Sequence, residues 1–362
     1  MASSLGKLFV ATSFGESHGR AVGVVIDGCP AGLPLNETDI QPELDRRRPG
    51  QSETATLRDE ADRAEIWSGI FRGYTTGAPL CLVTRNQDAD SSQYEAARFT
   101  PRPGHADYTS FVKYGGYSDY RGGGRFSGRL TAGWVMAGAV AKKLLAMTGV
   151  QIDAYTIAIG GIEAATEHYA DSSFPPQNQV HCPDTAAAEK MTQAILTARQ
   201  NGDSLGGVVE IVARGMPPGW GEPVANTLEG DLARAYFAIP AVKGVEFGAG
   251  FKAAAMHGSE NNDQFVMRQG KIEAASNNAG GILGGISSGM ALIARIAIKP
   301  TPSITQEQRT VNLQTLTDTK LHITGRHDAC IVPRAVVVAE SVTAIVLCDF
   351  ALQTGALPKV IT

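Results

Sequence analysis

The sequence has few cysteines and no surplus of positive charge. Its five cysteines, Cys29, Cys81, Cys182, Cys330 and Cys348, are far apart and form no CxxC pair, so we expect reduced thiols rather than a disulfide framework. The chain has 32 Lys and Arg residues and 36 Asp and Glu residues, which gives a net charge of -4. This charge does not favour sequence-independent binding of nucleic acid. Basic residues must therefore act locally, if they act at all.

No long hydrophobic run predicts a signal peptide or a membrane span. The N-terminus MASSLGKLFVATSFGE lacks a sustained apolar region behind a basic start. The uncharged run from Leu130 to Ala141 is too short to cross a bilayer, and the longer run from Ala274 to Ala294 is broken by Ser, Asn and Gly. We therefore expect a cytoplasmic protein with no membrane association.

The usual metal and nucleotide motifs are also missing. There is no HExxH and no His/Asp cluster at ligand spacing, so no metal site is predicted. The glycine-rich pieces NNAGGILGGISSG and YRGGGRFSG match neither GxxxxGK[ST] nor a GxGxxG that opens a βαβ unit. The sequence thus supports neither an ATP cradle nor a Rossmann dinucleotide site.

What remains is an ordinary globular composition, with 43% apolar and 19% charged residues over 362 positions. Length alone suggests about two domains, but no linker divides the chain, so we predict one domain over residues 1–362. Strand-like and helix-like segments come in mixed order, which favours an α+β fold with antiparallel sheet. The expected strands cover residues 8–13, 21–27, 64–67, 78–84, 206–213 and 290–298, and the expected helices 36–48, 127–148, 184–199, 228–238 and 333–352. Asn36 and Asp39 stand at the N-cap and N3 places of the first helix, Gly149 should stop the second, and residues 206–213 have alternating character.

One stretch, RGGGRFSGRLTAGW at residues 121–134, sets three glycines between two arginines just before a long apolar segment. Glycines let a backbone approach a ligand closely, and a helix start offers unpaired N–H groups to an anion. The stretch therefore reads as an anion cradle. The alternative is a flexible surface turn with solvated arginines.

Other chemically suggestive groups are spread along the chain: GESHG with His18, DRRRPG with three arginines, RPGHAD with His105, and GRHD with Asp328. Histidine is suited to proton transfer near neutral pH, and arginine binds phosphate and carboxylate in a fork. A lone histidine in a turn is more often structural. Three adjacent arginines on a helix cannot share one face, so at least one should be solvated.

Taken together and in order, these motifs carry a resemblance. GESHG, DRRRPG, RPGHAD, KYGG…DYRGGGR, IPAVKGVEFGAGF, AGGILGGISSG, KPTPSI and GRHD closely resemble chorismate synthase over nearly the whole chain. The resemblance implies helices sandwiched between antiparallel β-sheets, a homotetramer, and a lyase of the shikimate pathway to aromatic amino acids. It also implies conversion of 5-enolpyruvylshikimate 3-phosphate to chorismate and phosphate by a 1,4-elimination that needs reduced FMN. Whether NADPH or an external reductase supplies that FMN stays open.

The resemblance assigns roles residue by residue. It implies that His18 is the general acid for the departing phosphate, that His105 protonates or steadies reduced flavin, and that Asp328 and Ser17 relay a proton. Substrate anions would be bound by Arg47, Arg48 and Arg129. Contacts to FMN would come from Arg125, Phe126, Ser127, Pro240, Ala241, Gly284, Lys299, Pro300, Thr301, Pro302, Ser303 and Arg326.

The chain departs from the family pattern at two places. Where the family usually has SARET and then an arginine, this chain has Leu130 and Trp134 in place of the Glu and the Arg, and Glu53 stands where a basic residue is common. We expect Leu130 and Trp134 to form an apolar contact instead of an ion pair. Two other classes of function stay open: a flavin reductase that uses NAD(P)H, and an RNA-binding protein that uses RGGGR, although 7% aromatic residues offer few stacking platforms.

Overall fold

Two antiparallel five-stranded sheets form the frame of the computed structural model, which describes residues 3–48, 61–87, 91, 94–95, 97–165, 178–323 and 327–362. The first sheet has the order β1 (Ser4–Leu5), β2 (Val10–Gly15), β3 (Ala21–Asp27), β7 (Leu80–Arg85), β4 (Glu65–Ser68). The second has the order β11 (Val242–Phe247), β16 (Leu292–Ile298), β10 (Gly207–Arg214), β8 (Gln151–Ile159), β9 (Ile162–Glu163). All neighbouring strands in both sheets are antiparallel.

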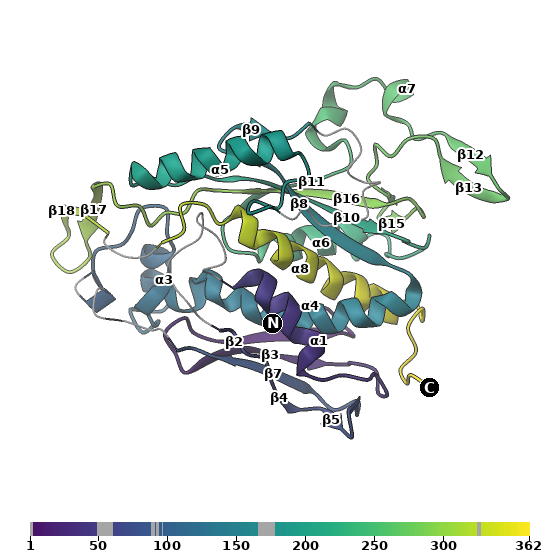
Figure 1. Cartoon of the computed structure of the whole chain (residues 1–362), viewed down its shortest axis with the longest axis horizontal. Coiled ribbons are helices and arrows are strands. Elements are labelled where there is room, and N and C mark those ends of the chain that lie inside the picture. Colours follow the sequence, from purple (N-terminus) through teal and green to yellow (C-terminus); the bar gives the residue numbers. More distant parts are fainter. Residues whose placement is uncertain are drawn as a thin grey trace.

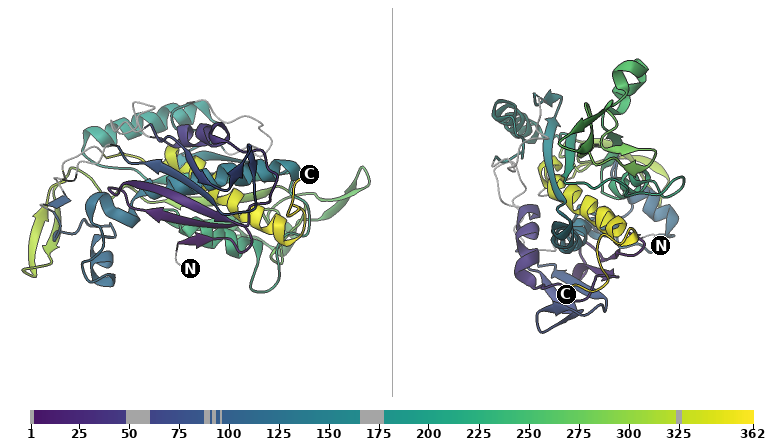
Figure 2. Two further views of the ribbon diagram at one scale, coloured as in Figure 1. Left: turned by 90° about the horizontal axis from the view of Figure 1, so that it is seen from below. Right: turned by 90° about the vertical axis from the view of Figure 1, so that its right-hand side faces the viewer.

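Helices fill the space between the two sheets (Figures 1 and 2). Helix α4 (Thr131–Leu145) packs on β3 and α8 (Val332–Gln353) packs on β8 and β10, while α4 and α8 pack on each other. Helices α1 (Glu37–Arg47) and α6 (Leu228–Phe237) lie beside them, and α5 (Thr185–Gln200) lies against β8 and β9. The predicted α+β sandwich is confirmed.

The two central helices are buried because their sequences offer no polar face. Along α8 nearly every residue is buried, from Val332 to Ala351. The segment containing α4 and the helix α8 are both long and apolar enough to span a membrane, but they are mostly buried inside the molecule. Gly138 lets them approach, because a Cβ there would lie 2.3 Å from the Cβ of Ser341.

Local signals decide where the helices begin and end. Asn36 caps α1, and Asp39 completes a capping box, as the sequence predicts. Asp184 caps α5 through the amide of Ala187. The predicted stop at Gly149 is also confirmed, since that residue ends the helical segment at φ 82°. The expected helix start at Ser127 is wrong by one turn, because a 3-10 turn at Gly128–Leu130 precedes α4.

Smaller elements decorate this frame. The helices α3 (Asp107–Lys113) and α7 (Gly258–Asn261) are short, and 3-10 turns lie at Arg121–Phe126, Ala146–Thr148 and Gly250–Ala255. Four hairpins pair β5 (Ile70–Phe71) with β6 (Tyr74–Thr75), β12 (Phe265–Arg268) with β13 (Lys271–Ala274), β14 (Ile282–Leu283) with β15 (Ile286–Ser287), and β17 (Gln308–Asn312) with β18 (Thr317–Leu321). The hairpin β12–β13 and α7 extend away from the body at one end (Figures 1 and 2).

Candidate active site

A cavity of about 810 Å³ brings together residues from distant parts of the chain. All four predicted catalytic residues line it, namely Ser17, His18, His105 and Asp328. Two of the predicted substrate ligands, Arg47 and Arg129, do so as well. Of the predicted FMN contacts, it is lined by Arg125, Phe126, Ser127, Pro240, Ala241, Lys299, Thr301, Pro302 and Ser303.

A few of the predicted residues do not line this cavity. Arg48 lies past the end of α1, partly exposed and 3.9 Å from Asp45. Gly284 lies in the turn between β14 and β15, and Pro300 is not part of the cavity wall, although its neighbours Lys299 and Thr301 are. Arg326 and Glu53 lie outside the described residues.

The three glycines of RGGGR place the backbone against both histidines. Gly122, Gly123 and Gly124 have φ values of 58°, 81° and 50°, which side chains disfavour. A Cβ on Gly122 would lie 2.5 Å from Nε2 of His18 and 2.8 Å from Oγ of Ser17. A Cβ on Gly123 would lie 3.1 Å from Cε1 of His105. Because Gly123 and Gly124 are buried, the alternative of a solvated surface turn is wrong.

His18 sits on the loop between β2 and β3. Its Nδ1 lies 2.9 Å from Oγ of Ser91, and its ring makes an edge contact with Tyr94 at 5.1 Å between centroids. The amide of Asn86 holds this loop, since its Nδ2 donates to the carbonyls of Glu16 (3.0 Å) and Gly19 (2.8 Å). The histidine is thus fixed from several sides.

His105 lies just before α3 in a charged cluster that includes two residues not singled out from the sequence. Its Nδ1 is 2.6 Å from Oδ1 of Asp107, and Arg102 donates to the same carboxylate at 2.7 and 2.9 Å. Burial alone raises the pKa of Asp107, but hydrogen bonds from Arg102 and His105 outweigh burial and hold that pKa well below its usual range. Asp107 is therefore a carboxylate that orients the imidazole. Its place two residues after His105 in RPGHAD is the only sequence signal.

Asp328 is held by Arg334, another residue that the sequence did not single out. Nη1 of Arg334 donates to Oδ2 of Asp328 at 2.6 Å, and its Nε donates to the carbonyl of Arg47 at 3.2 Å. Arg334 lies in the first turn of α8 and lines the cavity. Next to Asp328, His327 also lines the cavity, and burial, with a smaller contribution from Arg102, lowers the pKa of His327.

The three adjacent arginines of DRRRPG point to three different places. Arg46 makes a double hydrogen bond to Glu340 at 2.7 Å for each contact. Arg47 is buried and donates to Asp62 at 3.0 Å while lining the cavity. Arg48 is the most exposed of the three, with 40% of its side chain accessible.

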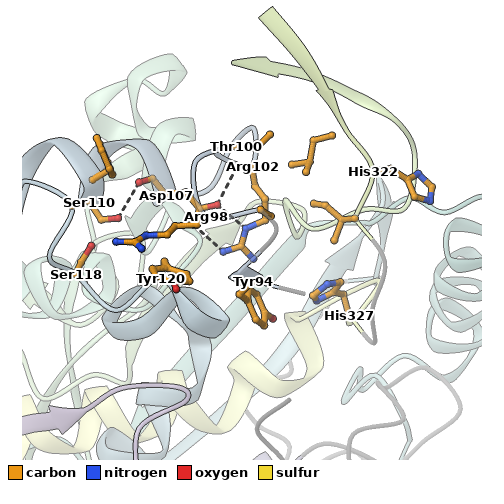
Figure 3. Close-up of a pocket in the computed structure, with 15 residues that line it drawn as sticks. Tyr94, Arg98, Thr100, Arg102, Asp107, Ser110, Ser118, Tyr120, His322 and His327 are labelled. Atoms are coloured by element: carbon orange, nitrogen blue, oxygen red, sulfur yellow. Dashed lines mark hydrogen bonds and ion pairs between the residues drawn. The ribbon is translucent and has the colours of Figure 1, made fainter. Parts of the chain in front are cut away.

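A second, smaller cavity of about 110 Å³ adjoins the first. Tyr94, Arg102 and His327 line both cavities, so they form the wall between them. Figure 3 shows Arg102 in this wall beside Asp107, with Tyr94 and His327 nearby.

Comparison with known proteins decides the family. A family model described as "Chorismate synthase" matches residues 9–352. A curated chorismate synthase of Dehalococcoides mccartyi is 59% identical over 362 residues, which are 100% of both chains. The chain belongs to the chorismate synthase family. The resemblance predicted from the motifs is thereby confirmed.

Further relatives agree with this assignment. A chorismate synthase of Korarchaeum cryptofilum is 53% identical over 343 residues, 94% of this chain and 95% of its own. A structure titled "Crystal Structure of Chorismate Synthase" aligns with a TM-score of 0.75 and 31% identity, covering 96% of this chain and 93% of the other. The chain is therefore an enzyme of the chorismate synthase class, the carbon–oxygen lyases.

Proposed function

We propose that the large cavity converts 5-enolpyruvylshikimate 3-phosphate to chorismate and inorganic phosphate by 1,4-elimination, with reduced FMN bound beside the substrate. The observation that carries the proposal is that His18 and His105 meet at one glycine turn and share a cavity with Arg47 and Arg129. Two proton-transfer groups and two anion ligands are what this reaction needs.

The charge of the cavity supports this substrate. Of the described residues that line it, Asp328 is the only carboxylate, whereas the cations are Arg47, Arg102, Arg125, Arg129, Lys243, Lys299 and Arg334. The substrate carries two carboxylates and a phosphate of about -1.5 to -2 charge. A cationic cavity in a chain of net charge -4 thus matches a multiply anionic ligand.

We assign the proton steps to four residues. His18 donates a proton to the departing phosphate. His105, oriented by Asp107 at 2.6 Å, protonates or steadies the reduced flavin. Asp328, held by Arg334 at 2.6 Å, works with Ser17 to relay the proton that leaves the substrate carbon.

The cavity is also suited to hold FMN, because it is large enough for a flavin beside a small acid and its wall carries cations for the FMN phosphate. Arg125 and Lys299 are anchored there: Arg125 donates to the carbonyls of Ser13 and Gly15 at 3.2 and 3.1 Å, and Lys299 donates to the carbonyl of Gly104. When bound, reduced FMN would supply a base for the proton that Asp328 and Ser17 relay, and the reaction would involve no net oxidation. NADPH is the reductant we propose for FMN if the chain reduces its own flavin.

We further propose a single domain over residues 1–362 that assembles as a cytoplasmic homotetramer. One cluster of buried apolar residues includes members of both sheets, which supports the single domain. The segment around α7 exposes Phe251 (84%), Phe265 (67%), Met267 (68%) and Ile272 (72%). Such a group of exposed apolar side chains supports a subunit contact.

An anaerobic assay with chemically reduced FMN tests the function. We expect chorismate and phosphate to appear in equal amounts. If they do not, the assignment is wrong. Rapid oxidation of NAD(P)H without the shikimate substrate would favour a flavin reductase, and a salt-dependent shift with RNA but none with the substrate would favour RNA binding.

A further inference from the structure

Asp62 is a buried carboxylate that joins the two cavity arginines. The residue is 3% exposed, and its two oxygens are divided between two guanidinium groups. Oδ2 accepts from Nη1 of Arg47 at 3.0 Å, and Oδ1 accepts from Nη1 of Arg129. Arg47 ends α1 and Arg129 precedes α4, so the carboxylate connects two elements far apart in the chain.

The backbone at Asp62 is strained, with φ at 42°. A non-glycine residue in this left-handed region costs free energy, and such costs persist where the surroundings require that position. Asp62 O also accepts from Nε2 of Gln41 at 3.2 Å, which fixes the segment against α1.

Other contacts fix the remaining orientation of each guanidinium. Nε of Arg47 donates to Oγ1 of Thr131 at 2.9 Å, and its Nη2 donates to the carbonyl of Gly128 at 2.9 Å. Nε of Arg129 donates to Oδ1 of Asn86 at 2.9 Å. Both side chains nevertheless line the cavity. Two guanidinium groups beside the same carboxylate repel each other. The negative charge of Asp62 lowers that repulsion, and its two oxygens fix the position of Arg47 relative to Arg129.

We propose that Asp62 is a positioning residue for substrate binding, which holds Arg47 and Arg129 side by side so that together they receive one anionic group of the substrate. This rests on the proposed function, in which both arginines bind substrate anions. Holding the pair in advance reduces the side-chain entropy that binding would otherwise cost. Asp62 does not touch the reacting atoms.

Glu340 offers a matched control for this proposal. It is also a buried carboxylate (3% exposed) shared by two cations, Arg46 and Lys142. Glu340, Arg46 and Lys142 do not line the large cavity. Loss of charge at Glu340 should therefore affect stability but not substrate binding.

The test compares Asp62→Asn with Glu340→Gln in the full chain with FMN. Asp62→Asn should raise KM for the substrate by roughly 10- to 100-fold, with a smaller change in kcat. Calorimetry with oxidised FMN, which prevents turnover, should show the same fold-change in the Kd of the substrate. Glu340→Gln should lower the melting temperature and leave KM and Kd unchanged.

The outcomes separate this inference from the proposed function. If the wild-type chain makes no chorismate, the proposed function fails. If the wild type turns over and folded Asp62→Asn keeps KM and Kd within twofold, only the role of Asp62 is overturned, and an equal rise in KM for Glu340→Gln overturns it too. Should Asp62→Asn not fold, Gln41→Ala decides, because Gln41 holds Asp62 through its carbonyl and does not line the cavity. Loss of that contact should raise KM roughly 3- to 10-fold, and an unchanged KM contradicts the proposal.

Discussion

Gly122 packs directly against the imidazole of His18, so closely that an added Cβ would lie 2.3 Å from Cδ2 of the ring. The histidine can keep its place only if position 122 has no side chain. Nearby, Gly123 packs less tightly against His105, because an added Cβ would lie 3.1 Å from Cε1 of that ring. The glycine turn therefore sets the positions of both groups that we assign to proton transfer.

Gly122→Ala should lower kcat by about 100-fold or more, because a displaced general acid loses most of its effect. Gly149→Ala is the control: its φ of 82° imposes a similar backbone cost, but nothing lies within 4 Å of the added Cβ. Steady-state kinetics and thermal unfolding of both variants check this. Equal turnover in the two variants would contradict it.

The proton roles predict that His18→Ala and His105→Ala each lower turnover by roughly 100- to 10,000-fold while FMN binding changes far less. Asp328→Asn should behave similarly. His257→Ala serves as control, since that side chain is 86% exposed and pairs with Glu260. Assays at saturating reduced FMN measure the effect, and near-normal turnover in a variant removes the role of that residue.

Asn86 connects the His18 loop with Arg129, because it donates to the loop carbonyls and accepts from the guanidinium. Asn86→Ala should therefore lower kcat and raise KM together, with a fall in kcat/KM of roughly 10- to 100-fold. Asn178→Ala also removes three hydrogen bonds within a turn and should cost stability only. If Asn86→Ala changes KM but not kcat, Asn86 does not support the position of His18.

Glu340 predicts a pH dependence of stability. Burial alone raises the pKa of Glu340, but Lys142 and Arg46 outweigh burial and lower the pKa to about 2. The folded pKa is below the ordinary value of 4.5, so this carboxylate stabilises the fold fully above pH 4.5 and loses that effect as the pH falls towards 2. Glu340→Gln should cost about 3–5 kcal/mol at pH 7. Denaturant unfolding measures the difference in the free energy of unfolding between the wild type and Glu340→Gln. This difference should become smaller below pH 4.5, and a difference that does not change with pH would contradict the pairing.

Leu130 and Trp134 lie at the start of α4 with 5% and 8% of their surface exposed. Both sites are therefore buried, as expected if an apolar contact takes the place of the family's Glu–Arg ion pair. Leu130→Glu should cost about 3–5 kcal/mol, because a single buried carboxylate lacks a partner. Leu130→Glu with Trp134→Arg should recover part of that loss, which a double-mutant cycle measures. The direct contact between the two side chains stays a prediction, and a coupling energy of zero would exclude it.

Local structure could be predicted where the signal is local. The capping box at Asn36 and the stop at Gly149 follow from a few neighbouring residues, and both are confirmed. Strand β8 was missed because it is buried on both sides over much of its length and so lacks alternation. For the same reason β10 does not show the alternation expected of it.

The contacts that hold the site together could not be predicted in this way. The motifs identified the residues that line the cavity, but they could not identify what holds them. Asp62 stands among several acidic and basic residues in TLRDEADRAE, where nothing marks one carboxylate from its neighbours. Arg102 and Arg334 pair with carboxylates only five and six residues away, Asp107 and Asp328, but nothing in the sequence pattern marks these pairs. The glycines of RGGGR were expected to let the backbone approach a ligand, and the contacts of Gly122 with His18 and of Gly123 with His105 could not be predicted from that stretch.

The central position of α8 has a consequence for the order in which the chain can fold. Residues 332–353 lie between the two sheets, in contact with α4, β8 and β10, yet they follow all of those elements in the sequence. During synthesis from the N-terminus, all five strands of the second sheet are therefore complete before the helix that packs on β8 and β10 exists. The nascent chain must carry exposed apolar strands until its last long helix is made, the stage at which chaperone binding protects a chain from aggregation.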